Sequence, residues 1–280
     1  MYDFYFGSAE SIRSDEKKFL LSIKRMLPRW VNSIPDSEYL AIADLLQEHV
    51  AKPNPILVET GVGASTIVLL HHALKHGGLL YSWDLSGPKG AYLRGVCQDT
   101  LLHQYRVNIF DHWTFVAYDS LSPHLGLAVL KELGKNVDFC FLDSEHTLDT
   151  VLGELTALEA SLRDGSIIAI DDANYTFRHT NYAYINMQRR KLGLSSLSSP
   201  AENNGAPFYQ EVEDFLGSRW RSVTHLPDNF KSTCREDLFF SYFQSERRVM
   251  DSAGMEKLAD LEHRFDAWRV ADRDLHRVAL

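Results

Sequence analysis

Acidic residues stand where short apolar runs of the chain end, and they are its main candidates for chemistry. They are Glu59, Asp84, Asp119, Asp143 and the pair Asp171–Asp172. Carboxylates gathered at one place repel one another, so they either take up protons or hold a cation. Asp143, Asp171 and Asp172 follow two successive apolar runs, and an all-oxygen set of this kind suits Mg²⁺. The sequence therefore predicts a magnesium site at these three residues.

Two further residues could transfer protons beside that site. Glu145 and His146 come directly after Asp143 and Ser144, and either could act as a general base if it reaches a bound hydroxyl group. A strand-end acid can also simply cap the next helix, and His146 can be an ordinary helix-start residue. The conjunction of acidic residues favours metal binding over capping for the aspartates, whereas for His146 a place at the start of a helix is favoured over a role as the base.

A glycine-rich segment, ILVETGVGAST at residues 56–66, predicts a strand, a tight loop and a helix N-terminus. Gly61 and Gly63 allow the backbone to come close to a ligand. The segment departs from the dinucleotide fingerprint, because Thr66 stands where that motif has Gly or Ala.

The elements that must position these residues alternate between strand-like and helix-like patterns. The alternation predicts an α/β fold with a doubly wound, mostly parallel sheet. The carboxyl ends of parallel strands share one edge, which brings the acidic residues together. The predicted strands are 56–59, 79–84, 114–118, 137–142 and 166–170, and the predicted helices between them are 65–75, 92–104, 126–133 and 148–162, with Asp164–Gly165 as a turn.

Three regions are expected. Residues 1–55 form an N-terminal helical extension, with helices near 15–31 and 36–50. Residues 56–245 form the central domain, which ends in an antiparallel strand pair at 221–226 and 238–243. Residues 246–280 form a C-terminal helix, so the whole is one elaborated domain.

Composition excludes several classes of function. The formal net charge is −9, and the short basic groups, Arg189–Lys191 among them, are expected to be solvated helix faces, so a nucleic-acid surface is not predicted. No apolar stretch is long enough to span a membrane. The three cysteines lack metal-site spacing, which indicates reduced thiols and a cytoplasmic protein.

With these features the chain resembles the class I S-adenosylmethionine-dependent methyltransferases, over about residues 56–243. It is most similar to the small-molecule O-methyltransferases of the macrocin and novobiocin type and the related metal-dependent group. Their acidic–x–Gly–x–Gly motif matches Glu59, Gly61 and Gly63. Ser65 stands where many members have a third glycine, and Glu145 where they have Asp.

The resemblance implies a Rossmann-like fold and roles for named residues. Asp84 would hold the ribose, Asp119 and Ser120 would lie near the adenine, and Glu145 or His146 would be the base. The implied metal ligands are those predicted above. The implied cofactor-binding residues are Glu59, Gly61, Gly63, Ser65, Thr66, Asp84, Asp119, Ser120 and Asp143.

The implied reaction is Mg²⁺-assisted methylation of a small-molecule hydroxyl by in-line displacement, as in natural-product biosynthesis. A homodimer is expected from the extra terminal helices. Three alternatives stay open: a metal-independent S-adenosylmethionine-dependent enzyme acting on nitrogen or carbon or by another reaction, an NAD-dependent oxidoreductase, and a non-catalytic binding module.

Overall fold

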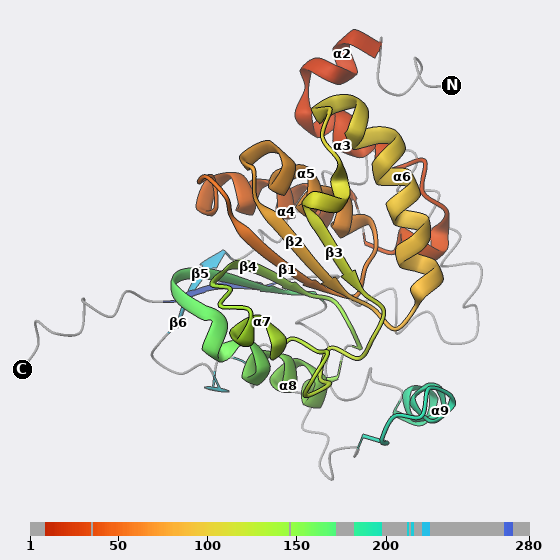
Figure 1. Cartoon of the computed structure of the whole chain (residues 1–280), viewed down its shortest axis with the longest axis vertical. Coiled ribbons are helices and arrows are strands. Elements are labelled where there is room, and N and C mark those ends of the chain that lie inside the picture. Colours follow the sequence, from red (N-terminus) through yellow and green to blue (C-terminus); the bar gives the residue numbers. More distant parts are fainter. Residues whose placement is uncertain are drawn as a thin grey trace, which may run out of the picture.

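The computed structural model describes residues 9–34, 36–145, 147–171, 182–197, 212, 214–215, 220–224 and 266–270. A central sheet lies between two layers of helices (Figure 1). The sheet strands are β1 (Ile56–Thr60), β2 (Leu79–Trp83), β3 (Trp113–Val116), β4 (Val137–Leu142), β5 (Leu162–Ile170), β6 (Trp220–Thr224) and β7 (Asp266–Val270). The helices are α2 (Ala9–Ser14), α3 (Glu16–Lys24), α4 (Asp36–His49), α5 (Ala64–His76), α6 (Gly87–Tyr105), α7 (Val129–Glu132), α8 (Leu148–Leu158) and α9 (Tyr182–Lys191), with 3-10 turns at Arg29–Val31, Ile109–Asp111 and Glu159–Ser161.

The strand order is β3-β2-β1-β4-β5-β7-β6. Strands β1 to β5 are parallel, and β7 pairs antiparallel with both β5 and β6. The order reverses between β1 and β4, which are neighbours. In open parallel sheets this switch point leaves a crevice at the carboxyl ends of the strands.

Alternate residues of the inner strands supply two separate cores, as the two-residue period of a strand requires. Leu57 of β1 packs in one core with residues of α3, α4, α5 and α6. Val58 packs in the other core, which includes Leu155 of α8 and Leu130 of α7. The N-terminal helices α3 and α4 therefore share a core with the central sheet.

Several predicted boundaries are wrong. Glu59 lies inside β1, because the strand continues to Thr60. Helix α6 begins at Gly87 and not at residue 92 as predicted. Pro88 lies in its first turn, where backbone N–H groups have no partner within the helix, so the missing N–H of proline costs no hydrogen bond. Strand β5 begins at Leu162, so the predicted Asp164–Gly165 turn is an irregularity within the strand, where the register with β4 shifts.

The C-terminal prediction is also corrected. Residues 266–270 belong to strand β7 and not to a helix, because they pair with β5 and β6. Strand β6 includes most of the first predicted strand at 221–226. The second predicted strand, 238–243, lies outside the described residues.

Candidate functional site

A pocket of about 160 Å³ opens at the switch point of the sheet. Its walls come from the ends of β1, β2 and β4, the loop after β3, the start of α8, and α9 with the residues after it. The lining residues are Thr60, Gly61, Trp83, Asp84, Leu85, Tyr118, Asp119, Ser120, Ser144, Glu145, Thr150, Arg189 and Leu194. Five of the residues predicted from the sequence thus meet here: Gly61, Asp84, Asp119, Ser120 and Glu145.

The backbone conformation at position 61, in the pocket wall, requires glycine. Its φ is +79°, and a Cβ at this position would lie 1.7 Å from the backbone oxygen of Asp143. Its N–H donates to the carbonyl oxygen of Trp83 at 2.8 Å, which ties the loop to β2. Gly63 is different, since its φ is −172° and the nearest atom to an added Cβ is 3.5 Å away.

The Glu59 carboxylate is fully buried and does not line the pocket. It accepts hydrogen bonds from Ser65 Oγ at 2.6 Å, Thr66 Oγ1 at 2.8 Å and Ser82 Oγ at 3.0 Å. Thr66 Oγ1 in turn accepts from the N–H of Gly63. Burial raises the pKa of Glu59 to about 7, against the opposing effect of the three hydroxyl donors. The glycine loop is therefore stabilised, on the side away from the pocket, by hydrogen bonds among Glu59, Ser65 and Thr66.

Asp84 connects the glycine loop with the start of α6. Its Oδ2 accepts from the N–H of Val62 at 3.0 Å, and its Oδ1 accepts from the N–H of Ser86 at 2.7 Å. Lys89 Nζ lies 3.3 Å from Oδ2. The side chain is thus held in one orientation at the pocket wall.

Asp119 and Ser120 lie in the loop that follows β3. Asp119 Oδ1 accepts from the N–H of Leu121 at 2.9 Å. The Ser120 hydroxyl donates to Glu154 Oε1 at 2.6 Å. Both residues reach the pocket as predicted, although β3 itself ends at Val116.

Glu145 is already engaged in the pocket wall. Its Oε2 accepts from Arg189 Nη1 at 2.6 Å and from Thr150 Oγ1 at 2.9 Å. Arg189 also donates through Nε to the carbonyl oxygen of Ser195, and the residue is only 8% exposed. The expectation of a solvated face at Arg189 is therefore wrong. His146, the second predicted base, lies outside the described residues.

The predicted metal ligands are described in part. Asp143 and Asp171 follow adjacent strands, and the N–H of Asp171 donates to the carbonyl oxygen of Leu142, the residue before Asp143. Neither aspartate lines the pocket, and Asp172 lies outside the described residues. Within the part of the chain that the structure describes, no group of three or more His, Cys, Asp or Glu side chains is placed to hold a metal ion.

Residues 58–173 match a family model described as a methyltransferase domain. Residues 58–173 form a methyltransferase domain. The match includes the glycine loop, the ends of the parallel strands and the pocket residues up to Thr150. It confirms the fold and the family resemblance predicted from the sequence. No curated protein sequence matches the chain.

Several solved structures have a fold similar to that of this chain. A putative O-methyltransferase from Klebsiella pneumoniae is 15% identical, with a TM-score of 0.52 over 93% of this chain and 94% of that chain. The O-methyltransferase TomG from Streptomyces achromogenes, solved with S-adenosylmethionine and involved in tomaymycin synthesis, is 13% identical, with a TM-score of 0.53 over 92% and 91%. An O-methyltransferase from Bacillus cereus, solved with S-adenosylhomocysteine, is 14% identical, with a TM-score of 0.50 over 97% and 100%.

The sequence did not single out Arg189, which lines the pocket, or Glu154, a buried residue that contacts the pocket residues Ser120 and Thr60. Arg189 lies on α9, beyond the matched residues, and only the fold brings it to Glu145. Glu154 lies on α8, three residues after Val151 and four before Leu158, on the face that the helix pattern predicts to be apolar. A single acid within such a stripe was the available signal.

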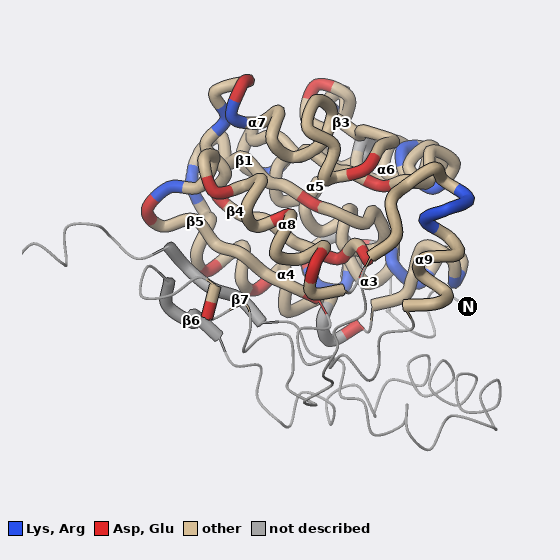
Figure 2. The backbone as a smooth tube through the Cα atoms, turned by 90° about the horizontal axis from the view of Figure 1, so that it is seen from below, with Lys and Arg blue, Asp and Glu red and all other residues tan. Residues whose placement is uncertain are grey.

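Figure 2 shows acidic segments in the middle of the tube near α8 and β4, and both acidic and basic segments at the edges near β5, α7 and α6. Among the described residues that line the pocket, three are acids, Asp84, Asp119 and Glu145, and one, Arg189, is a cation. None of the helices in the described ranges is long and apolar enough to cross a lipid bilayer.

Proposed function

We propose that the methyltransferase domain binds S-adenosylmethionine in this pocket and methylates a hydroxyl oxygen of a small molecule, with Mg²⁺ as cofactor. The observation that carries the proposal is the arrangement of Gly61 and Asp84. The left-handed Gly61 opens the loop beside β4, and the Asp84 carboxylate stands at the pocket wall, where a ribose hydroxyl could donate to it.

The hydrogen-bond acceptors of the pocket fit this cofactor. Asp84, Asp119 and Glu145 offer carboxylate oxygens, which suit a ligand that carries a positive charge and several hydrogen-bond donors. The oxidoreductase alternative would require NAD in this pocket. The same acids would repel the negatively charged pyrophosphate of NAD. Asp84 and the Gly61 backbone would hold the cofactor, with Asp119 and Ser120 at its far end.

When bound, S-adenosylmethionine supplies a methyl group on a positively charged sulfur, and Mg²⁺ supplies positive charge beside the acceptor oxygen. Asp143 and Asp171 would hold the ion together with Asp172, since hard carboxylate oxygens from adjacent strands suit it. Glu145 would accept the proton of the acceptor hydroxyl at Oε1, because Arg189 and Thr150 both occupy Oε2. His146 stays the second candidate for this role.

Calorimetry with S-adenosylhomocysteine, NAD and Mg²⁺ tests the proposal. The expected result is binding of S-adenosylhomocysteine without binding of NAD, together with Mg²⁺ binding that Asp171→Asn weakens. Binding of NAD alone would support the oxidoreductase alternative. Binding of S-adenosylhomocysteine without any binding of Mg²⁺ would leave the metal-independent enzyme as the better account.

The assembly and location of the enzyme are also part of the proposal. We propose a cytoplasmic homodimer without nucleic-acid or membrane partners. The net charge of −9 disfavours nucleic acid, and the three cysteines without metal-site spacing favour a reducing compartment. The helices outside the matched domain are the reason to expect a dimer. The acceptor of the enzyme would be a small molecule of natural-product biosynthesis. Sedimentation of the full chain tests the dimer.

A further inference from the structure

Glu154 of α8 lies directly beneath the pocket. Its side chain is fully buried, and its two oxygens contact two different parts of the pocket lining. Oε1 accepts from the Ser120 hydroxyl at 2.6 Å, and Oε2 accepts from the Thr60 hydroxyl at 3.1 Å. Glu154 does not line the pocket itself, but Ser120 and Thr60 do.

Glu154 and Glu59 lie on opposite faces of the sheet. Successive residues of a strand point to opposite faces, so Glu59 and Thr60 of β1 reach different helix layers. Glu59 meets Ser65 and Thr66 on the α5 side, whereas Thr60 meets Glu154 on the α8 side. Two buried carboxylates therefore brace the end of β1, one from each face.

The protonation state of Glu154 determines whether the neighbouring hydroxyl groups donate or accept hydrogen bonds. Burial raises the pKa of Glu154 to about 7, and the side chains of Ser120, Ser144 and Thr60 oppose that rise. Above this pH the carboxylate is ionised and can only accept hydrogen bonds. Each hydroxyl has a single hydrogen, so Ser120 and Thr60 donate to Glu154 and turn their lone pairs toward the pocket.

We propose that Glu154 is a positioning residue that makes the hydroxyls of Thr60 and Ser120 hydrogen-bond acceptors for the ligand of this pocket. The pocket would therefore select a ligand that places N–H or O–H donors against Thr60 and Ser120. The inference rests on the proposed function only in taking S-adenosylhomocysteine as the probe.

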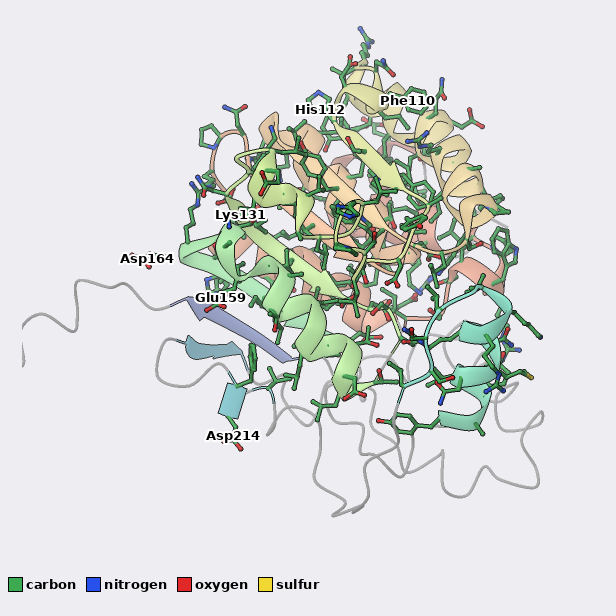
Figure 3. All side chains as sticks on the ribbon, turned by 60° about the horizontal axis from the view of Figure 1, so that its bottom comes forward. Phe110, His112, Lys131, Glu159, Asp164 and Asp214 are labelled. Carbon is green, nitrogen blue, oxygen red and sulfur yellow. The ribbon has the colours of Figure 1, made fainter. Side chains whose placement is uncertain are left out.

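The test compares the affinity of full-length variants for S-adenosylhomocysteine at pH 8. Glu154→Met removes both acceptor oxygens at similar volume, and we expect affinity to fall about tenfold, the size of one hydrogen bond. Glu154→Gln keeps one acceptor oxygen, so its loss should be smaller. Glu159→Gln is the matched control, because Glu159 is exposed and lies at the end of α8 away from α9 (Figure 3).

A double-mutant cycle separates positioning from a purely structural role. If Glu154 acts through Ser120, the losses caused by Glu154→Gln and Ser120→Ala will not add in the double variant. Glu154→Met loses two hydrogen bonds but also removes a carboxylate whose ionised form burial disfavours, so the variant should bind weakly while its urea midpoint stays near that of the wild type.

Three outcomes would overturn the inference. They are wild-type affinity in Glu154→Met, additive losses in the cycle, or an affinity loss that only follows a loss of stability. If Glu154→Met does not fold, the cycle with Glu154→Gln decides. A wild-type chain that fails to bind S-adenosylhomocysteine would instead overturn the proposed function.

Discussion

Arg189 Nη1 lies 2.6 Å from Oε2 of Glu145, and this ion pair joins α9 to the loop after β4. Only Glu145 belongs to the residues matched as a methyltransferase domain. Because Arg189 is buried against this carboxylate, α9 fixes the orientation of the residue proposed as the base. The region after the matched domain thus completes the pocket.

Removing this ion pair should lower turnover more than cofactor affinity. Arg189→Ala leaves Glu145 without its charged partner, and a hydrogen bond between charged groups contributes about 1.5–3 kcal/mol, so kcat should fall roughly ten- to hundredfold. Arg190→Ala is the control, because Arg190 is the exposed neighbour on the same helix. Steady-state kinetics on an identified acceptor measure both. Equal kcat values in the two variants would contradict a role for the pair.

The two glycines of the motif should differ sharply in their tolerance of a side chain. Gly61→Ala places a Cβ against the backbone of Asp143 at a positive φ, so we expect a loss of stability of at least about 1–3 kcal/mol and loss of cofactor binding. Gly63→Ala meets no such contact and should change stability by less than about 1 kcal/mol. Urea unfolding measures the difference, and equal losses in both variants would refute this account of the loop.

Asp84 should determine affinity for the cofactor product. Asp84→Asn keeps the size of the side chain but removes one carboxylate oxygen, and we expect S-adenosylhomocysteine to bind about tenfold more weakly or worse. Asp99→Asn serves as the control, since Asp99 is exposed on α6. Calorimetry at constant salt makes the comparison. Unchanged affinity in Asp84→Asn would remove Asp84 from the site.

The buried carboxyl of Glu154 predicts a pH dependence of stability. Its pKa is raised by burial from 4.5 in the unfolded chain to about 7 in the fold, so the folded state holds a proton that the unfolded chain has lost between these values. Its stabilising contribution is complete below pH 4.5 and is lost as pH rises to about 7, by on the order of 3 kcal/mol.

Glu154→Gln cannot titrate at this position and isolates the effect from other groups. The buried His72, whose pKa is lowered to about 4 chiefly by burial, acts in the opposite direction, because its contribution is lost as pH falls from 6.5 toward 4. The difference in unfolding free energy between wild type and Glu154→Gln should therefore shift against the wild type from pH 5 to pH 7.5. A difference that does not vary with pH would show that Glu154 does not titrate in this range.

Local pattern was enough to predict the parallel core of the fold. The bounds of β4 agree with the predicted 137–142, because a strand buried on both faces has a nearly continuous apolar sequence. Parallel topology then predicted the shared edge that brings Gly61, Asp84, Asp119 and Glu145 into one pocket.

The errors have non-local causes. The segment 266–270, DAWRV, fits a helix or a strand equally well in so short a run, and its pairing with β5 decides the outcome. In the sequence, Arg189 is one of three successive basic residues on a polar helix. Its ion pair with Glu145 forms only through the tertiary fold, so the local pattern could not predict it. Glu59 matches the family motif in position, yet its carboxylate faces the buried hydroxyls of α5 and β2.

The central claim is tested most directly by an experimental structure of the chain with S-adenosylhomocysteine and Mg²⁺ bound. We predict S-adenosylhomocysteine against Gly61, with its ribose at Asp84, and an ion held by Asp143 and Asp171. S-adenosylhomocysteine bound away from Gly61 and Asp84, or no ion at these aspartates at saturating Mg²⁺, would contradict this account.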